Sequence, residues 1–142
     1  MMVAHGLQIQ VMGIRSVIEE FSFVTTGIFM SSYFVGYFVG SKTTPALVSK
    51  VGHIRVFAAF ASLASLSALI AVVYISPFMW TISRFITGIS LVSCYVVCES
   101  WLNDRANNKN RGQLLSTYMI VIYLGLAMGM LLLNLSSPMN YE

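Results

Sequence analysis

The residue of this sequence best placed to do chemistry in an apolar setting is Arg84. It lies in the run from residue 77 to residue 98, where no other side chain is charged. A charge near the centre of a bilayer costs about 2.5–3.5 kcal/mol or more. Either the guanidinium holds its helix to a neighbour by donating to backbone carbonyls, or it faces a water-filled cavity and binds an anion or tunes a carboxylate. These residues alone leave both interpretations open.

Helical spacing places Arg84 on a polar stripe. At 100° per residue, one arc of about 80° holds Thr81, Arg84, Gly88, Leu91, Tyr95 and Glu99. Apolar side chains such as Ile82 and Phe85 occupy the opposite side, where they can meet lipid. Arg84 lies six residues beyond Phe78, about 9 Å along a helix axis. If Arg84 faces a cavity, Gly88 and Tyr95 on the same stripe are the further candidates for lining it; the spacing itself leaves both interpretations of Arg84 open.

The composition indicates that these residues lie in a lipid membrane. Charged residues make up 9% of the 142-residue chain and hydrophobic residues 57%, and the mean hydropathy is +0.79. Ordinary soluble domains carry about 25% charged residues. The net charge of +3 comes from basic residues in short connections, not from a patch with interleaved aromatics, so nucleic acid is not a predicted partner. The sequence predicts an integral membrane protein whose partner is the lipid bilayer.

Four apolar stretches are long enough to cross a hydrocarbon core, which needs about 20 helical residues. They cover residues 21–41, 56–75, 78–98 and 114–135. Open strands would leave backbone groups unpaired in lipid, so the predicted fold is all-α, with four transmembrane helices. Residues 1–14 are apolar but too short to span; they are either the end of a preceding helix or a short interfacial leader.

Charges in the connections predict the orientation. Six basic residues flank the first and third connections: Lys42, Lys50, Arg55, Arg105, Lys109 and Arg111. Arg15 is the one basic residue on the other side. By the positive-inside rule the first and third connections are cytoplasmic, and both ends of this chain lie outside.

Residues for other chemistry are sparse. Cys94 and Cys98 lie four apart in an apolar run and suit small buried hydrophobes, because metal ligation would need further ligands. The two histidines, His5 and His53, lie outside the complete spans, so a Ser–His arrangement in the bilayer has no base. We expect no enzyme, no metal and no cofactor.

Two stretches carry a resemblance to a known family. "SRFITGIS" resembles the R-x-x-x-G element on the fourth helix of the major facilitator superfamily of secondary transporters, with Arg84 and Gly88 in its two positions. "PALVSKVGHIRVF" resembles the signature loop between the second and third helices, with Lys50, Gly52 and Arg55 in its basic and glycine positions. Pro45 replaces a glycine and Ser49 the usual aspartate, so an aspartate-based gate is not implied.

The block "ESWLNDRANNKNRGQLLSTYM" is similar to a bacterial subgroup of permeases compared with sugar or drug efflux carriers. The resemblance implies helices two to five of a six-helix bundle, preceded by the end of helix one. It implies alternating access around a small solute, with the remaining helices supplied by the same transporter or by a separate chain. This chain alone is then not expected to transport.

The resemblance also assigns a cytoplasmic gate. Its candidate residues are Lys50, Gly52, His53 and Arg55, with Glu99 and Arg111 as loop-side partners. A different class also stays open: a complete four-helix membrane protein that acts as a small exporter subunit or assembly partner. Such exporters use an intramembrane carboxylate, and no Asp or Glu lies within the four predicted spans.

Overall fold

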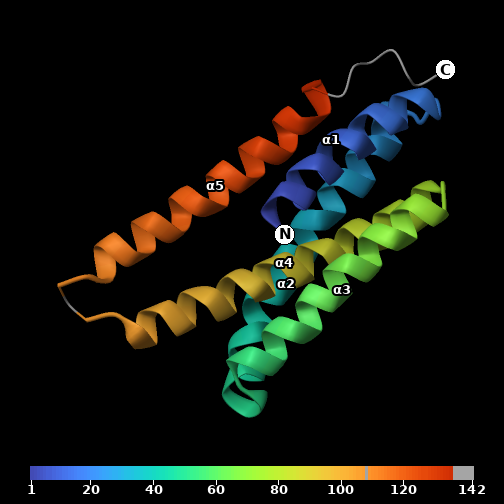
Figure 1. Cartoon of the computed structure of the whole chain (residues 1–142). Helices are drawn as coiled ribbons and strands as arrows, with labels where there is room; N and C mark the ends of the chain where they lie inside the picture. Colours follow the sequence, from blue (N-terminus) through green and yellow to red (C-terminus); the bar gives the residue numbers. More distant parts are fainter. Residues whose placement is uncertain (108, 136–142) are drawn as a thin grey trace. The chain divides into compact units, whose positions relative to one another are not determined.

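A computed structural model describes residues 1–107 and 109–135 (Figure 1). In this part of the chain the elements are five helices and no strand: α1 (Met2–Ile18), α2 (Phe23–Val51), α3 (His53–Val73), α4 (Pro77–Arg105) and α5 (Arg111–Leu135). The last four of these helices are long and apolar enough to cross a membrane. The prediction of an all-α fold with four transmembrane helices is therefore confirmed.

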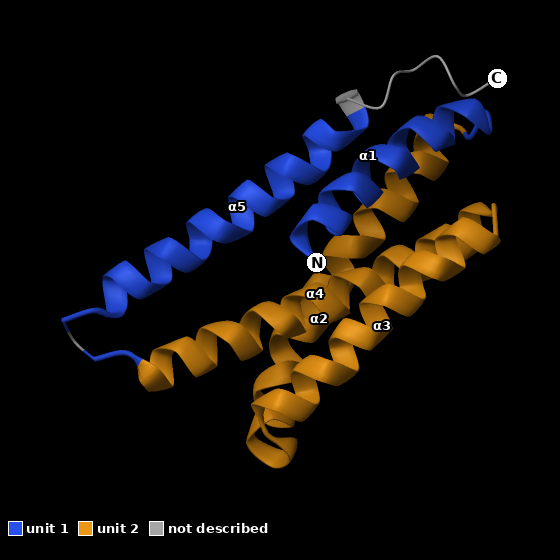
Figure 2. Cartoon of the chain, in the orientation of Figure 1, with its two compact units in different colours: residues 1–21, 106–142 blue, residues 22–105 orange. Residues whose placement is uncertain are grey.

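The contacts divide the chain into two compact units, coloured separately in Figure 2. One unit joins residues 1–21 to residues from 106 onward and contains α1 and α5; the other covers residues 22–105 and contains α2, α3 and α4. Each unit is described below by itself. The single membrane domain expected over residues 1–142 stays a prediction.

The helices extend beyond the spans that hydropathy predicts. α2 continues ten residues past position 41, through Pro45, and α4 continues seven residues past position 98. Hydropathy marks where the chain leaves lipid, whereas a helix ends where its backbone hydrogen bonds end. Most of the expected first connection is therefore helical, and Gly52 alone separates α2 from α3.

A seam of small residues joins α2 to α4. Ser32, Gly36, Gly40 and Thr44 recur every four residues along α2, and each contacts α4. The Ser32 hydroxyl donates to the Thr81 carbonyl at 3.0 Å, and Thr44 shares a 2.7 Å hydrogen bond with Ser93. Both pairs are 49 residues apart, so the two helices run parallel in one register. Small side chains permit this approach, which supplies van der Waals contact where no hydrophobic effect drives association.

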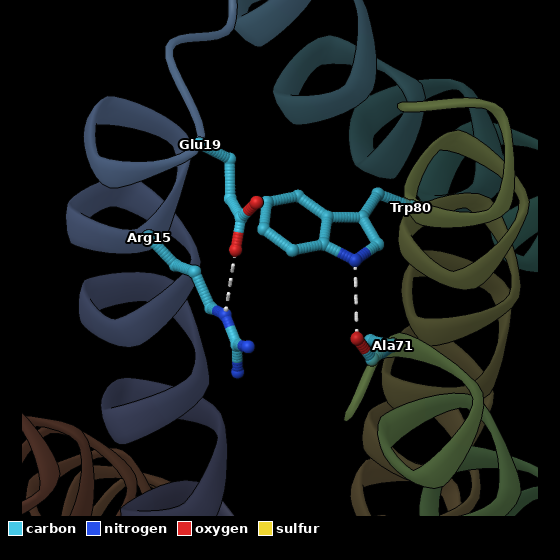
Figure 3. A network of polar contacts seen from close by, with 4 residues as sticks. All are labelled: Arg15, Glu19, Ala71 and Trp80. Atoms are coloured by element: carbon cyan, nitrogen blue, oxygen red, sulfur yellow. Dashed lines mark hydrogen bonds and ion pairs between the residues drawn. The ribbon is translucent and has the colours of Figure 1, made fainter. Parts of the chain in front are cut away.

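α3 packs against the other side of α4 and runs antiparallel to it. Ser67 of α3 shares a 2.9 Å hydrogen bond with Thr87, and its carbonyl accepts from Ser83 at 2.7 Å. Nearer the end of α3, the Ala71 carbonyl accepts from the Trp80 indole N–H at 3.0 Å, as Figure 3 shows. These hydroxyls and the indole find their acceptors within the unit, so α4 is held on two sides by α2 and α3.

The other unit consists of α1 packed along α5. Gly6 of α1 lies against the Leu126 backbone, and Gly129 of α5 lies against the Val3 backbone. Arg15 Nε lies 3.5 Å from Glu19 Oε1 in the last turn of α1, the ion pair drawn in Figure 3. Close glycine contact is thus the packing mode in both units.

The α2–α4 seam predicts the effect of adding one methyl group. A Cβ at Gly36 would lie 3.0 Å from the Phe85 carbonyl carbon and 3.1 Å from the Ile89 nitrogen, so Gly36→Ala forces two backbones apart. We expect a loss of about 1–3 kcal/mol in the unfolding free energy.

Gly27→Ala is the matched control, because Gly27 lies on the same helix and a Cβ there would meet nothing within 4 Å. Because alanine has a higher helix propensity than glycine, Gly27→Ala should leave the unfolding free energy unchanged or raise it by up to about 1 kcal/mol. Both variants are measured by thermal unfolding of the purified chain in one detergent. Equal stability of the two variants would contradict the proposed seam.

Candidate functional site

Arg84 lies on the face of α4 that meets α2, and it is buried with 4% of its surface exposed. Its guanidinium carbon lies 5.4 Å from the centre of the Tyr33 ring on α2, within the range of a cation–π contact. Its Nη2 donates to the Met30 sulfur at 3.3 Å. The charge therefore contacts a ring face and a thioether sulfur of α2, and neither of these groups is a strong hydrogen-bond acceptor.

The remaining donors of Arg84 bear on both interpretations of this residue. Nε and Nη1 are both buried, and neither has a hydrogen-bond acceptor among the described residues. A tie to the neighbouring helix would bring backbone carbonyls to these nitrogens. A buried charged donor that lacks an acceptor costs several kcal/mol. This cost is larger than the stabilisation of about 2 kcal/mol that a cation–π contact provides. The arrangement can therefore bind an acceptor-rich group, such as a carboxylate, a phosphate or water.

Gly88 and Tyr95, the other two cavity candidates, lie in different surroundings. Gly88 is buried against α2, where a Cβ would approach the Tyr33 carbonyl and lie 2.9 Å from the Tyr37 nitrogen. This contact sets how close Arg84 comes to the Tyr33 ring, since the arginine lies one turn earlier on the same face. Tyr95 is half-buried, about two turns beyond Gly88 on α4.

The expected gate loop is a tight corner built on Gly52. Its φ of +90° and ψ of 157° suit glycine, which lacks a Cβ, and Gly52 is the single residue between α2 and α3. Lys50 and Arg55, on either side of it, are both exposed. Among the described residues neither has an ion pair with Glu99.

His53 begins α3 and reaches the end of α4. Its Nε2 lies 3.0 Å from the Ser100 hydroxyl and 3.8 Å from Asp104 Oδ2. Both partners meet the same ring nitrogen, whereas a Ser–His–Asp relay places the carboxylate on Nδ1. Because Asp104 is exposed, a charged pair with it would be worth at most about 1 kcal/mol. This contact joins α3 to α4 at the corner.

Glu99 and Arg111, the two expected loop-side partners, belong to different units. Glu99 lines a cavity with residues of α2 and α4. Arg111 begins α5 and is exposed.

The sequence reasoning missed the immediate partners of Arg84 and of His53. Tyr33 lies directly after Ser32 of the α2 seam, so an aromatic ring bordering a small-residue face was the available signal. Nothing in the sequence around Met30 indicated that this residue contacts Arg84. Ser100 and Asp104 lie one turn apart on α4 and within helical reach of one another, but only the α3–α4 packing brings them to His53.

Comparison with known proteins gives a consistent result. A sequence model of the Major Facilitator Superfamily matches residues 2–137. The chain is 35% identical over 116 residues to the Uncharacterized MFS-type transporter YcaD of Escherichia coli O45:K1 (strain S88 / ExPEC), and 34% identical to that of strain E24377A of E. coli O139:H28. Each alignment covers 82% of this chain and 30% of the relative. No solved structure matches.

Proposed function

We propose that this chain, which belongs to the major facilitator superfamily, forms part of a secondary active transporter that moves a small solute by alternating access. The curated relatives are named as transporters, and four helices of the chain are long and apolar enough to cross a membrane. The main structural observation behind the proposal is that Arg84 is a buried cation. Its Nε and Nη1 lack a hydrogen-bond acceptor among the described residues.

Arg84 is proposed to face the solute path. A guanidinium held by packing and not by acceptors is preorganised for a group that comes and goes, because binding that group costs no broken ion pair. The Met30 sulfur is a weak acceptor on a flexible side chain, so a stronger acceptor can displace it. Arg84 therefore either binds an anionic part of the solute or interacts with a carboxylate that carries the coupling proton. Gly88 fixes the backbone distance, and Tyr95 extends the same stripe.

Transport is proposed to need helices beyond those of this chain. The chain spans about 30% of the length of the curated relatives that it matches. Solute sites in this family's architecture lie between two helical halves near the middle of the membrane. The further helices come either from the same polypeptide or from a separate chain, and the chain by itself is not transport-competent.

Substitution of Arg84 tests its role in the assembled transporter. Hydrogen bonds to charged groups contribute about 1.5–3 kcal/mol, so Arg84→Gln is expected to lower uptake about 10- to 100-fold. Arg84→Lys keeps the charge but loses the planar donor set, and it should also lose most uptake. The measurement is mass spectrometry of solutes retained by membrane vesicles from a mixture of sugars, organic acids and amines.

Arg105→Gln is the matched control, because Arg105 ends the same helix and its guanidinium contacts the exposed Trp101 ring. It should keep uptake at the level of the unmodified protein. Uptake by Arg84→Gln equal to that of Arg105→Gln at equal expression would refute the role of Arg84. Saturable uptake by proteoliposomes holding this chain alone would refute the need for further helices.

The proposed location is the bacterial cytoplasmic membrane, with the corner at Gly52 and the α4–α5 connection in the cytoplasm. The basic residues gathered at these connections support this orientation through the positive-inside rule. Both ends of this chain then lie on the outer face.

Reporter insertions test the orientation at internal positions. Alkaline phosphatase, which is active only outside the cytoplasm, is inserted after Ser76 in one protein and after Asn110 in another. We expect high activity from the first and background activity from the second, each divided by expression level. The reverse pattern would show that the chain is oppositely inserted.

A further inference from the structure

A cavity of about 470 Å³ lies between the last turns of α2 and α4. Its lining residues come from these two helices: Pro45, Val48, Ser49, Val96, Glu99, Ser100 and Asn103. This volume falls within the range of small-molecule sites, about 300–1,000 Å³. Glu99 lies 15 residues beyond Arg84 on α4, about 22 Å along the helix axis, so the cavity is separate from the proposed solute path.

The cavity follows from how the α2–α4 seam ends. The two helices touch through Gly36, Gly40 and Gly88, and the last hydrogen bond of the seam joins Thr44 to Ser93. Beyond this pair neither helix contains a glycine up to its last residue. The close approach that glycine permits ends there, and Pro45 adds a rigid ring to one wall of the cavity.

The lining combines apolar walls with oxygen acceptors and one negative charge. Pro45, Val48 and Val96 present hydrocarbon. The Ser49 hydroxyl donates its proton to the Ala46 carbonyl at 2.9 Å, which leaves its oxygen free to accept. The Glu99 carboxylate has neither an ion pair nor a hydrogen bond within the part of the chain that the structure describes. Such a site suits a group that is positive at one end and apolar along its length.

We propose that this cavity binds an alkylammonium or alkylguanidinium group, with its charge on Glu99 and its stem against Pro45, Val48 and Val96. Two sources share this chemistry: a diffusible amine, and a lysine or arginine side chain from a helix outside this chain. Either occupant bridges the ends of α2 and α4 beyond the seam. Its charge also pairs with a half-buried carboxylate that has no partner among the described residues.

Calorimetric titration of the purified full chain in lipid nanodiscs tests the site. The probe is n-butylguanidinium, and n-butylurea serves as a neutral probe of nearly the same shape. We expect saturable heat with the cation, and affinity at least tenfold weaker for the urea. Glu99→Gln should weaken cation binding at least tenfold, since hydrogen bonds to charged groups contribute about 1.5–3 kcal/mol.

Asp104→Asn is the matched control, because Asp104 is an exposed carboxylate on the same helix and outside the cavity lining. It should bind the cation as the unmodified chain does. Equal binding of the two probes by the unmodified chain would overturn the proposal without any variant. Undiminished binding by a folded Glu99→Gln chain would also overturn it.

Carbodiimide labelling of Glu99, with Asp104 as the internal reference, distinguishes the two sources. Labelling that is blocked in washed native membranes and restored on purification identifies a protein side chain. If Glu99 is labelled in washed membranes and added n-butylguanidinium blocks this labelling, the occupant is a diffusible amine. Labelling of Glu99 that stays equal to that of Asp104 in native membranes and with saturating probe would overturn the proposal.

Discussion

The contact on which the rest of this structure depends is the backbone-to-backbone approach of α2 and α4. Gly36 and Gly40 on one helix, and Gly88 on the other, leave no room for a Cβ at the points of contact. This approach sets the common register of the two helices and aligns Thr44 with Ser93. It also brings the Tyr33 ring to Arg84. The geometry at Arg84 and the opening beyond Pro45 are both consequences of where the glycines occur and where they stop.

Two charged side chains without an ion-pair partner among the described residues lie toward opposite ends of α4. Arg84 lies within the lipid-crossing part of the helix with an aromatic face and a thioether beside it, and Glu99 lies near its far end in an open cavity. A soluble domain would leave such groups to water. In a membrane each unsatisfied group is expensive, and intramembrane charges therefore accompany function more often than stability. Three hydroxyls of α4 show the contrast, because Ser83, Thr87 and Ser93 all find acceptors on packed neighbours or within their own helix. The buried Ser90 hydroxyl is the exception on this helix, with no hydrogen-bond partner among the described residues.

The sequence predicted the features of the fold that depend on composition and on the periodic spacing of residue types. Apolar length gave the four spans. That the small residues from Ser32 to Thr44 pack on α4 came from the structure. Helix length beyond the membrane was underestimated, because polar helical turns at Lys50 and Asp104 carry no hydropathy signal. The partners of Arg84 depend on interhelical register, which Ser32–Thr81 and Thr44–Ser93 fix in space and which one helix alone does not encode.

The central claim is that the position of Arg84 is reached by water during transport. Reactivity of Arg84→Cys toward a membrane-impermeant charged thiosulfonate tests it in native membranes, in a background where Cys94 and Cys98 are alanine. Ile82→Cys, at a partly exposed position on the apolar side of α4, is the control. The account predicts rapid modification at position 84 and little at position 82, because thiols react as thiolates and need water. No modification at position 84, in protein that still inserts and folds, would contradict the account.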